Sequence, residues 1–187
     1  MNLPFVSIII NNYNYGRFLE SAIDSALRQT YPHVEIIVVD DGSIDDSRKI
    51  IASYANKVLP VLKPNGGQAS AFNAGFAASR GEIICFLDAD DLMLPQRIET
   101  VVHILTTQPD LMWGYHQVRQ IDAAGNPIGD APRPNETEQV FRFDVRDEIE
   151  QGFLRQLPLP LPGTSGFCFR RSHLQKSYPC PKLKALP

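Results

Sequence analysis

Four short apolar runs in the first part of the chain alternate with segments of helical periodicity. The runs are rich in Ile and Val, residues that favour strands, and they lie at 6–10, 35–39, 58–62 and 82–87. The segments that carry apolar residues at helical spacing lie at 18–27, 50–54, 68–80 and 95–108. This alternation predicts an α/β fold, a mostly parallel sheet flanked by helices on both sides.

The pattern is less regular after residue 110. The expected elements are an extended segment at 111–121, a turn at 124–127, a loop at 129–139, a helix at 141–157 and a strand at 166–169. The prolines at 158–162 exclude a helix or a central strand there. We therefore expect one domain in two parts: the regular half at 1–110 and a short mixed portion at 111–187.

Composition and charge narrow the class of protein. The 187 residues are 43% hydrophobic and carry a formal net charge of −3, which argues against a nucleic-acid-binding protein. No apolar run reaches the roughly 20 residues of a membrane-spanning helix, and the start of the chain lacks the features of a signal peptide. The cysteines are too few and scattered for a disulfide framework, so we expect a cytoplasmic protein.

Polar side chains follow three of the four predicted strands. They are Asn11 and Tyr13 after the first run, Asp40 and Asp41 after the second, and Asp88, Asp90 and Asp91 after the fourth. In open α/β sheets, ligands bind outside the carboxyl ends of the strands. Carboxylates gathered there repel one another unless a cation or hydrogen-bond donors offset their charge. We therefore expect a ligand site at this edge, although capping of the next helix is an alternative role for Asp41 and Asp91.

The spacing of these carboxylates indicates which of them act together. Asp88 and Asp90 lie two residues apart, so they share one side of an extended chain, whereas only one of Asp40 and Asp41 faces a ligand. Oxygen ligands suit Mg²⁺ or Mn²⁺, which bind one or two carboxylates together with phosphates and water. The absence of a Gly-x-Gly-x-x-Gly turn after the first run disfavours a Rossmann dehydrogenase.

Several motifs in one order resemble the family 2 inverting glycosyltransferases, which have the GT-A fold. The motifs are Val6–Asn14, Val38–Ser43, Asn65–Gln68, Asn73–Gly75 and Leu87–Asp91, with a weaker match at Gly163–Arg171. The strong match covers roughly residues 5–110, the half that binds the nucleotide sugar in this family. The resemblance implies that residues 111–187 form the acceptor side of the same domain.

The resemblance implies a role for each matching residue. Asn11 and Tyr13 would lie along the base and ribose, and Asp40 would hydrogen-bond the base, typically uracil. Asp88 would approach the ribose or the metal ion, and Asp90 would bind the Mn²⁺ or Mg²⁺ ion on the diphosphate. The residues that would border the nucleotide are Asn65, Gly67 and Gln68. The donor is expected to be a UDP-sugar; the acceptor, whether saccharide, lipid-linked or protein, is not identified, and some relatives work at the inner face of the membrane.

The implied reaction needs a general base that this stretch does not supply. In the family an acceptor hydroxyl attacks the anomeric carbon of the sugar, and an Asp or Glu downstream of the closing strand accepts its proton. Residues 172–187 contain neither Asp nor Glu. We therefore expect the base beyond Pro187, in a longer protein. The alternative is a nucleotide-sugar-binding module or fragment that is catalytically incomplete.

Overall fold

The structure is a computed structural model in which the chain forms two compact units. The first comprises Met1–Tyr115 with Thr164–Pro187, and the second comprises His116–Gly163. The described residues are 3–54, 56–116, 118–129 and 163–175. The predicted helix at 141–157, the prolines at 158–162 and nearly all of the predicted loop at 129–139 lie outside them.

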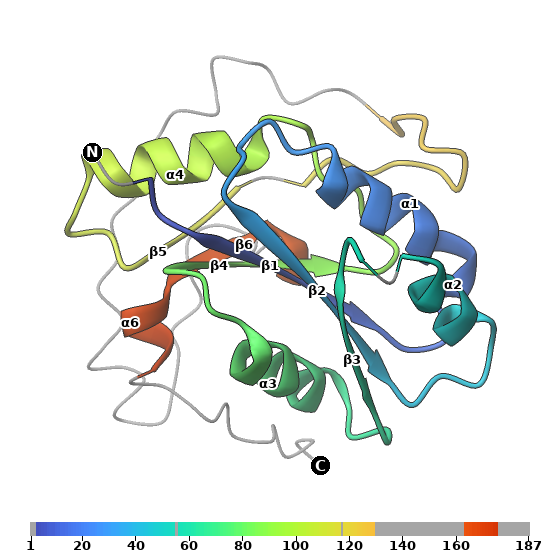
Figure 1. Ribbon diagram of the computed structural model, residues 1–187. Coiled ribbons are helices and arrows are strands. Elements are labelled where there is room, and N and C mark those ends of the chain that lie inside the picture. The colour runs from blue at the N-terminus through green and yellow to red at the C-terminus, as the bar shows by residue number, and fades with distance from the viewer. Residues whose placement is uncertain (1–2, 55, 117, 130–162, 176–187) are drawn as a thin grey trace, which may run out of the picture. The chain divides into compact units, whose positions relative to one another are not determined.

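The first unit alternates strands and helices as the apolar pattern predicts (Figure 1). Its elements are β1 (Val6–Asn12), α1 (Gly16–Leu27), β2 (Val34–Asp41), α2 (Ser47–Ser53), β3 (Leu59–Lys63), α3 (Gln68–Ala78), β4 (Ile83–Asp88), α4 (Arg97–Thr107), β5 (Trp113–Tyr115), a 3-10 turn (Thr164–Gly166), β6 (Phe167–Arg170) and α6 (Arg171–Leu174). Each predicted strand and helix of the first half is found within a few residues of its expected place.

The described strands form one six-stranded sheet in the order β3-β2-β1-β4-β6-β5. The first four strands in this order run parallel to one another, whereas β6 runs antiparallel to both β4 and β5. Pro60 lies in β3, at the edge of the sheet, where its missing N–H group leaves no central ladder position unpaired. The predicted α/β class, with a mostly parallel sheet and a mixed C-terminal portion, is confirmed.

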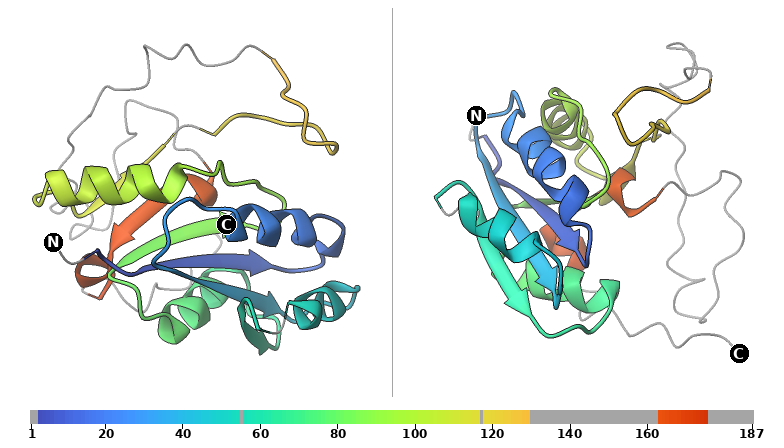
Figure 2. Two further views of the ribbon diagram at one scale, coloured as in Figure 1. Left: turned by 45° about the horizontal axis from the view of Figure 1, so that its top comes forward. Right: turned by 90° about the vertical axis from the view of Figure 1, so that its right-hand side faces the viewer.

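Helices cover both faces of this sheet (Figures 1 and 2). On one face α1, α2 and α4 pack over a core that includes Ile8, Ile10 and Val38. On the other face α3 and α6 pack over a core that includes Ile9 and Val39. Because successive residues of the central strands are buried on opposite faces, the middle of each strand is a continuous apolar run, as is typical of parallel sheets.

The second half differs from its predicted pattern in one respect. The segment expected to be extended over 111–121 forms a sheet strand only at β5. Farther along, within the second unit, the predicted turn at 124–127 is present: Ile121 pairs with Pro127, and the carboxylate of Asp122 accepts hydrogen bonds from the backbone N–H groups of Ala124 and Asn126.

Candidate ligand-binding site

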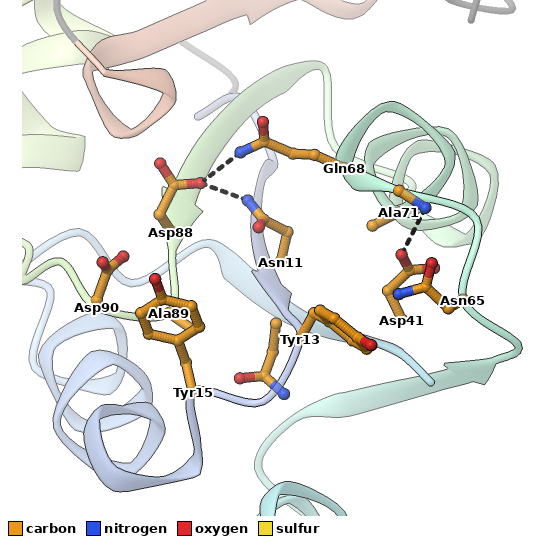
Figure 3. Close-up of a pocket in the computed structure, with 12 residues that line it drawn as sticks. Asn11, Tyr13, Tyr15, Asp41, Asn65, Gln68, Ala71, Asp88, Ala89 and Asp90 are labelled. Carbon is orange, nitrogen blue, oxygen red and sulfur yellow. Dashed lines mark hydrogen bonds between the residues drawn. The ribbon is translucent and has the colours of Figure 1, made fainter. Parts of the chain in front are cut away.

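A pocket of about 380 Å³ lies where β1, β2 and β4 end and α3 begins (Figure 3). Its volume falls within the usual range for small-molecule sites. The lining residues are Asn11, Asn12, Tyr13, Tyr15, Asp41, Asn65, Gly67, Gln68, Ala71, Asp88, Ala89 and Asp90. The strand ends therefore form a common site, as expected for ligands at the carboxyl edge of an open α/β sheet.

The alternation of side chains decides which strand-end residues enter this pocket. Ile9, Val39 and Phe86 belong to the core beneath α3. The residues two positions after each of them share the same face of the sheet and all line the pocket; they are Asn11, Asp41 and Asp88. The pocket therefore opens on the α3 side of the sheet.

Asp41 holds the loop that precedes α3. Its carboxylate accepts hydrogen bonds from the backbone N–H groups of Gly66 and Gly67, at 3.0 and 2.8 Å, and from the ammonium group of Lys63. Gly67 has a φ of +84°, a conformation that glycine adopts without strain. Asp41 thus fixes one wall of the pocket through the loop before α3, and it does not cap α2, the helix that follows β2.

Asp40, which the resemblance places against the base, is not among the residues that line the pocket. Its side chain is fully buried on the opposite face of the sheet. It accepts hydrogen bonds from Asn12 Nδ2 at 3.1 Å, Ser43 N at 3.2 Å and Arg48 Nε at 2.8 Å. Burial alone would raise the pKa of Asp40, but the hydrogen bonds from Ser43, Arg48 and Asn12 outweigh it and lower this pKa. Asp40 thus has a structural environment, and Asp41 takes the place at the pocket.

Asp88 stands where β1, α3 and the turn before β6 meet. Its carboxylate accepts hydrogen bonds from Asn11 Nδ2, Gln68 Nε2 and Thr164 Oγ1 (Figure 3 shows the first two). Its own backbone N–H donates to Ser165 Oγ at 2.8 Å. The turn at Thr164–Gly166 therefore closes onto the end of β4 through contacts that no local sequence pattern indicates.

Burial, together with the acidic turn after β4, raises the pKa of the Asp88 carboxyl. Burial is the largest cause, and the charges of Asp91 and Asp90 add to it, while hydrogen bonds from Thr164 and Gln68 act in the opposite direction. Negative charge at this turn is thus compensated only in part by protein donors. A cation beside Asp90, which lines the pocket, would offset the repulsion.

The donor set at this end fits a divalent ion that takes most of its ligands from elsewhere. Among the described residues no group of three or more His, Cys, Asp or Glu side chains is placed to hold a metal. Mg²⁺ and Mn²⁺ sites commonly use one or two carboxylates and complete their coordination with phosphate oxygens and water. Asp90, with or without Asp88, fits this arrangement, and a closed zinc site does not.

Two of the predicted residues, Asn11 and Tyr13, lie between the two acidic ends of the pocket. In Figure 3, Asp88 and Asp90 stand on one side and Asp41 and Asn65 on the other, with Asn11 and Tyr13 between them. Tyr13 is 47% exposed, so an aromatic ligand could stack on its ring. The lining residues to which the resemblance assigns no role are Asn12, Tyr15, Ala71 and Ala89.

No helix in the described part of the chain is long and apolar enough to cross a membrane.

Comparison with known proteins was made for both sequence and structure. The family model described as glycosyl transferase family 2 matches residues 7–177. An uncharacterized glycosyltransferase of Nostoc sp. is 37% identical over 185 residues, which cover 96% of this chain and 55% of the relative. The chain therefore spans about half the length of that relative.

Two solved structures share the fold. A mannosyltransferase from Pyrobaculum calidifontis, solved with GDP-Man and Mn²⁺, has a TM-score of 0.62 and 21% identity, over 94% of this chain and 47% of its own. Glucosyl-3-phosphoglycerate synthase from Mycobacterium tuberculosis, solved with Mn²⁺, UDP and glucosyl-3-phosphoglycerate, has a TM-score of 0.59 and 21% identity, over 90% of this chain and 57% of its own. At this identity the likeness establishes the fold alone.

Proposed function

Because the chain belongs to glycosyl transferase family 2, we propose that its pocket binds the nucleoside diphosphate of a sugar donor, UDP, together with Mn²⁺ or Mg²⁺. The family assignment confirms the resemblance drawn from the motifs, and with it the GT-A fold. The observation that carries the proposal is the convergence of Asn11, Asp41, Asp88 and Asp90 on one pocket.

The two ends of the pocket suit the two ends of a nucleoside diphosphate. The base would stack on Tyr13 and meet Asp41 and Asn65, which replaces our expectation that Asp40 contacts it. The ribose would lie near Asn11 and Asp88, and Gly67 and Gln68 would border the nucleotide at the start of α3. The diphosphate would then reach Asp90, where a bound cation would offset the repulsion among the carboxylates of the acidic turn.

The reaction that we propose is transfer of the sugar to an acceptor hydroxyl with inversion at the anomeric carbon. The hydroxyl oxygen forms a bond to that carbon and gives its proton to a general base, while the bond to the diphosphate oxygen breaks, so negative charge develops on the leaving UDP. When bound, a divalent ion stabilises this charge. Asp90 would hold the ion, and Asp88 would orient the donor through its contacts with Asn11, Gln68 and Thr164.

The general base and the acceptor belong to the whole protein. The carboxylates that line the pocket have other roles in this proposal, which therefore assigns the general base to none of them. The chain covers about half of its relative in Nostoc, in keeping with a donor-binding part of a longer enzyme. The buried free thiols of Cys85 and Cys168 suit the reducing cytoplasm that we propose as the location.

Titration of the chain with UDP in the presence and absence of Mn²⁺ tests the binding proposal. We expect calorimetric binding of UDP that requires Mn²⁺ and is lost in Asp90→Asn. Asp91→Asn removes the same charge from the same turn at a residue outside the pocket wall, so it should keep Mn²⁺-dependent binding.

Three outcomes decide between the alternatives. Absence of UDP binding by the wild type would overturn the proposal, and tighter binding of GDP would replace uracil by guanine as the base. Equal losses in Asp90→Asn and Asp91→Asn would show that the total charge of the turn matters and that Asp90 has no specific role. Release of UDP from UDP-sugars by the chain itself would show that these residues turn over, whereas binding without release would identify a donor-binding module.

A further inference from the structure

A buried guanidinium group lies behind the acidic turn. Arg97 is the first residue of α4 and only 9% exposed. Its terminal nitrogens donate to the backbone carbonyls of Phe86, at 3.3 and 3.4 Å, and of Phe167, at 3.4 Å. Its Nε atom is buried with no hydrogen-bond partner. This charge is therefore held by carbonyl groups at long distances, an arrangement that costs desolvation energy and yields little stability in return.

The two carbonyls belong to β4, which ends at the pocket, and to β6, its antiparallel neighbour in the sheet. Phe86 precedes Asp88 by two residues on β4, and Phe167 begins β6 directly after the turn that contains Thr164 and Ser165. The guanidinium of Arg97 thus joins β4, which carries Asp88, to β6, which directly follows Thr164 and Ser165. At the other end of the β4–β6 pair, Ile83 of β4 lies opposite Arg170 of β6.

The charge of Arg97 also acts on the acidic turn. No described residue forms an ion pair with this guanidinium. Burial lowers the pKa of Arg97, and the nearby charge of Asp91 is among the interactions that favour its charged form. The direct contacts of the guanidinium are therefore its hydrogen bonds to the carbonyls of Phe86 and Phe167.

We propose that Arg97 is a positioning residue for the donor site: it clamps the ends of β4 and β6 together, so that Asp88 and Thr164 stay in contact behind the metal-binding carboxylate of Asp90. The inference rests on the proposed function, because the purpose of the clamp is a correctly placed metal and nucleotide. Groups that orient a metal ligand from behind commonly change metal affinity by about 10- to 100-fold when they are altered.

Arg97→Lys tests the clamp. Its matched control is Arg170→Lys, because Arg170 also joins β6 to α4. Lys keeps the charge but lacks the planar fork that spans two carbonyls. Arg170, on β6, makes a comparable contact at the far end of α4, donating to the carbonyls of Leu111 and Leu105. Arg170→Lys therefore removes an equivalent fork at a distance from the pocket, and a merely structural role would make both variants alike.

Two measurements separate positioning from stability. The first is Mn²⁺ affinity in saturating UDP, followed by the electron paramagnetic resonance of free Mn²⁺; we expect Arg97→Lys to weaken it about tenfold and Arg170→Lys to leave it within twofold. The second is hydrogen exchange of the Asp88 backbone amide, which donates to Ser165 Oγ and reports the junction without any ligand. It should exchange at least tenfold faster in Arg97→Lys only.

Equal effects of the two substitutions on both measurements, or wild-type behaviour of Arg97→Lys, would overturn the inference. Arg97→Met removes the charge as well and should weaken Mn²⁺ binding further, but only Arg97→Lys is needed if the Met variant does not fold. If the wild type bound no Mn²⁺ in the presence of UDP, the proposed function would be wrong, and the clamp would still be judged by the exchange of the Asp88 amide.

Discussion

Adjacent aspartates at the end of β2 give the sharpest test of the site. Asp40 and Asp41 differ by one position, point to opposite faces of the sheet and are both buried. Replacement of each by Asn removes one charge and preserves the shape of the side chain. We expect Asp40→Asn to reduce stability and leave UDP affinity unchanged, and Asp41→Asn to reduce UDP affinity.

The stability cost of Asp40→Asn follows from its three donors. An Asn oxygen in the place of Oδ2 keeps the bonds from Arg48 and Ser43 but loses their charge assistance, and the new amide group then faces Asn12 Nδ2, which is also a donor. Such a loss costs about 1–3 kcal/mol. Asn12 can reduce the cost by turning its amide, because its Oδ1 atom has no partner in the wild type. We therefore expect about 2 kcal/mol, or a decrease in melting temperature of about 4–8 °C.

The cost of Asp41→Asn falls on the pocket as well as on the fold. Asn keeps one acceptor for the N–H groups of Gly66 and Gly67 and turns an amide toward the other donors, which include Lys63. The loop before α3 then loses one of its attachments. One charge-assisted hydrogen bond is worth about 1.5–3 kcal/mol, so UDP affinity should fall about 10- to 100-fold.

Both variants are measured by thermal unfolding and by calorimetric titration with UDP and Mn²⁺, the titration being run at least 15 °C below the lower melting temperature. The ratio of the two UDP affinities is then independent of unfolding. If Asp40→Asn weakened UDP binding as much as Asp41→Asn, Asp40 would face the ligand after all, and the assignment of the pocket to the α3 side would be refuted.

Three further predictions concern packing, acid stability and base stacking. A Cβ atom at Gly75 would lie 2.4 Å from Cγ2 of Ile9, so Gly75→Ala should destabilise the fold by about 1–2 kcal/mol in urea unfolding, despite the better helix propensity of Ala; no loss would show that α3 can move away from the sheet. Burial would raise the pKa of Glu35, but hydrogen bonds from Ser7 and Arg80 lower it overall. The stability that Glu35 contributes is therefore present above its ordinary pKa of 4.5 and is lost as the pH falls through the lowered value. The difference in unfolding free energy between the wild type and Glu35→Gln should shrink below about pH 4, and a difference that stayed constant would contradict this. Tyr13→Ala should weaken UDP binding by roughly 5- to 100-fold, as expected for a lost stacking contact, with little change in melting temperature because the ring is 47% exposed.

The sequence was sufficient for the fold because the parallel strands are buried on both faces. Continuous runs such as Ile8–Ile10 and Ile83–Leu87 have few alternatives to a central strand when helical segments follow them at short distances. The same pattern is absent after residue 110, where β5 and β6 are short and lie at one side of the sheet. There the contacts that select a strand come from residues far apart in the chain.

The candidate site was predictable in its place at the sheet edge but not in its partners. Asp88 meets Thr164 and Ser165, which lie about 76 residues farther along the chain, and Arg97 meets Phe167 across a similar distance. Neither contact follows from spacing or from a local motif, because both depend on β6 returning antiparallel beside β4. The roles of Thr164, Ser165 and Arg97 could therefore not be predicted from the sequence, because they depend on long-range strand pairing.

The exchange of Asp40 for Asp41 has a different origin. Alternation along β2 requires that only one of them enters the pocket, but alternation alone does not say which face of the sheet carries the ligand. That choice is made by α3, whose preceding loop supplies the N–H groups of Gly66 and Gly67 on one side only. A carboxylate on that side gains these donors, whereas one on the other side must find its donors in Asn12 and Arg48. The face that binds the ligand is therefore set by where the glycine-rich loop crosses the sheet, and a substitution that moved this loop should impair the pocket while leaving the environment of Asp40 intact.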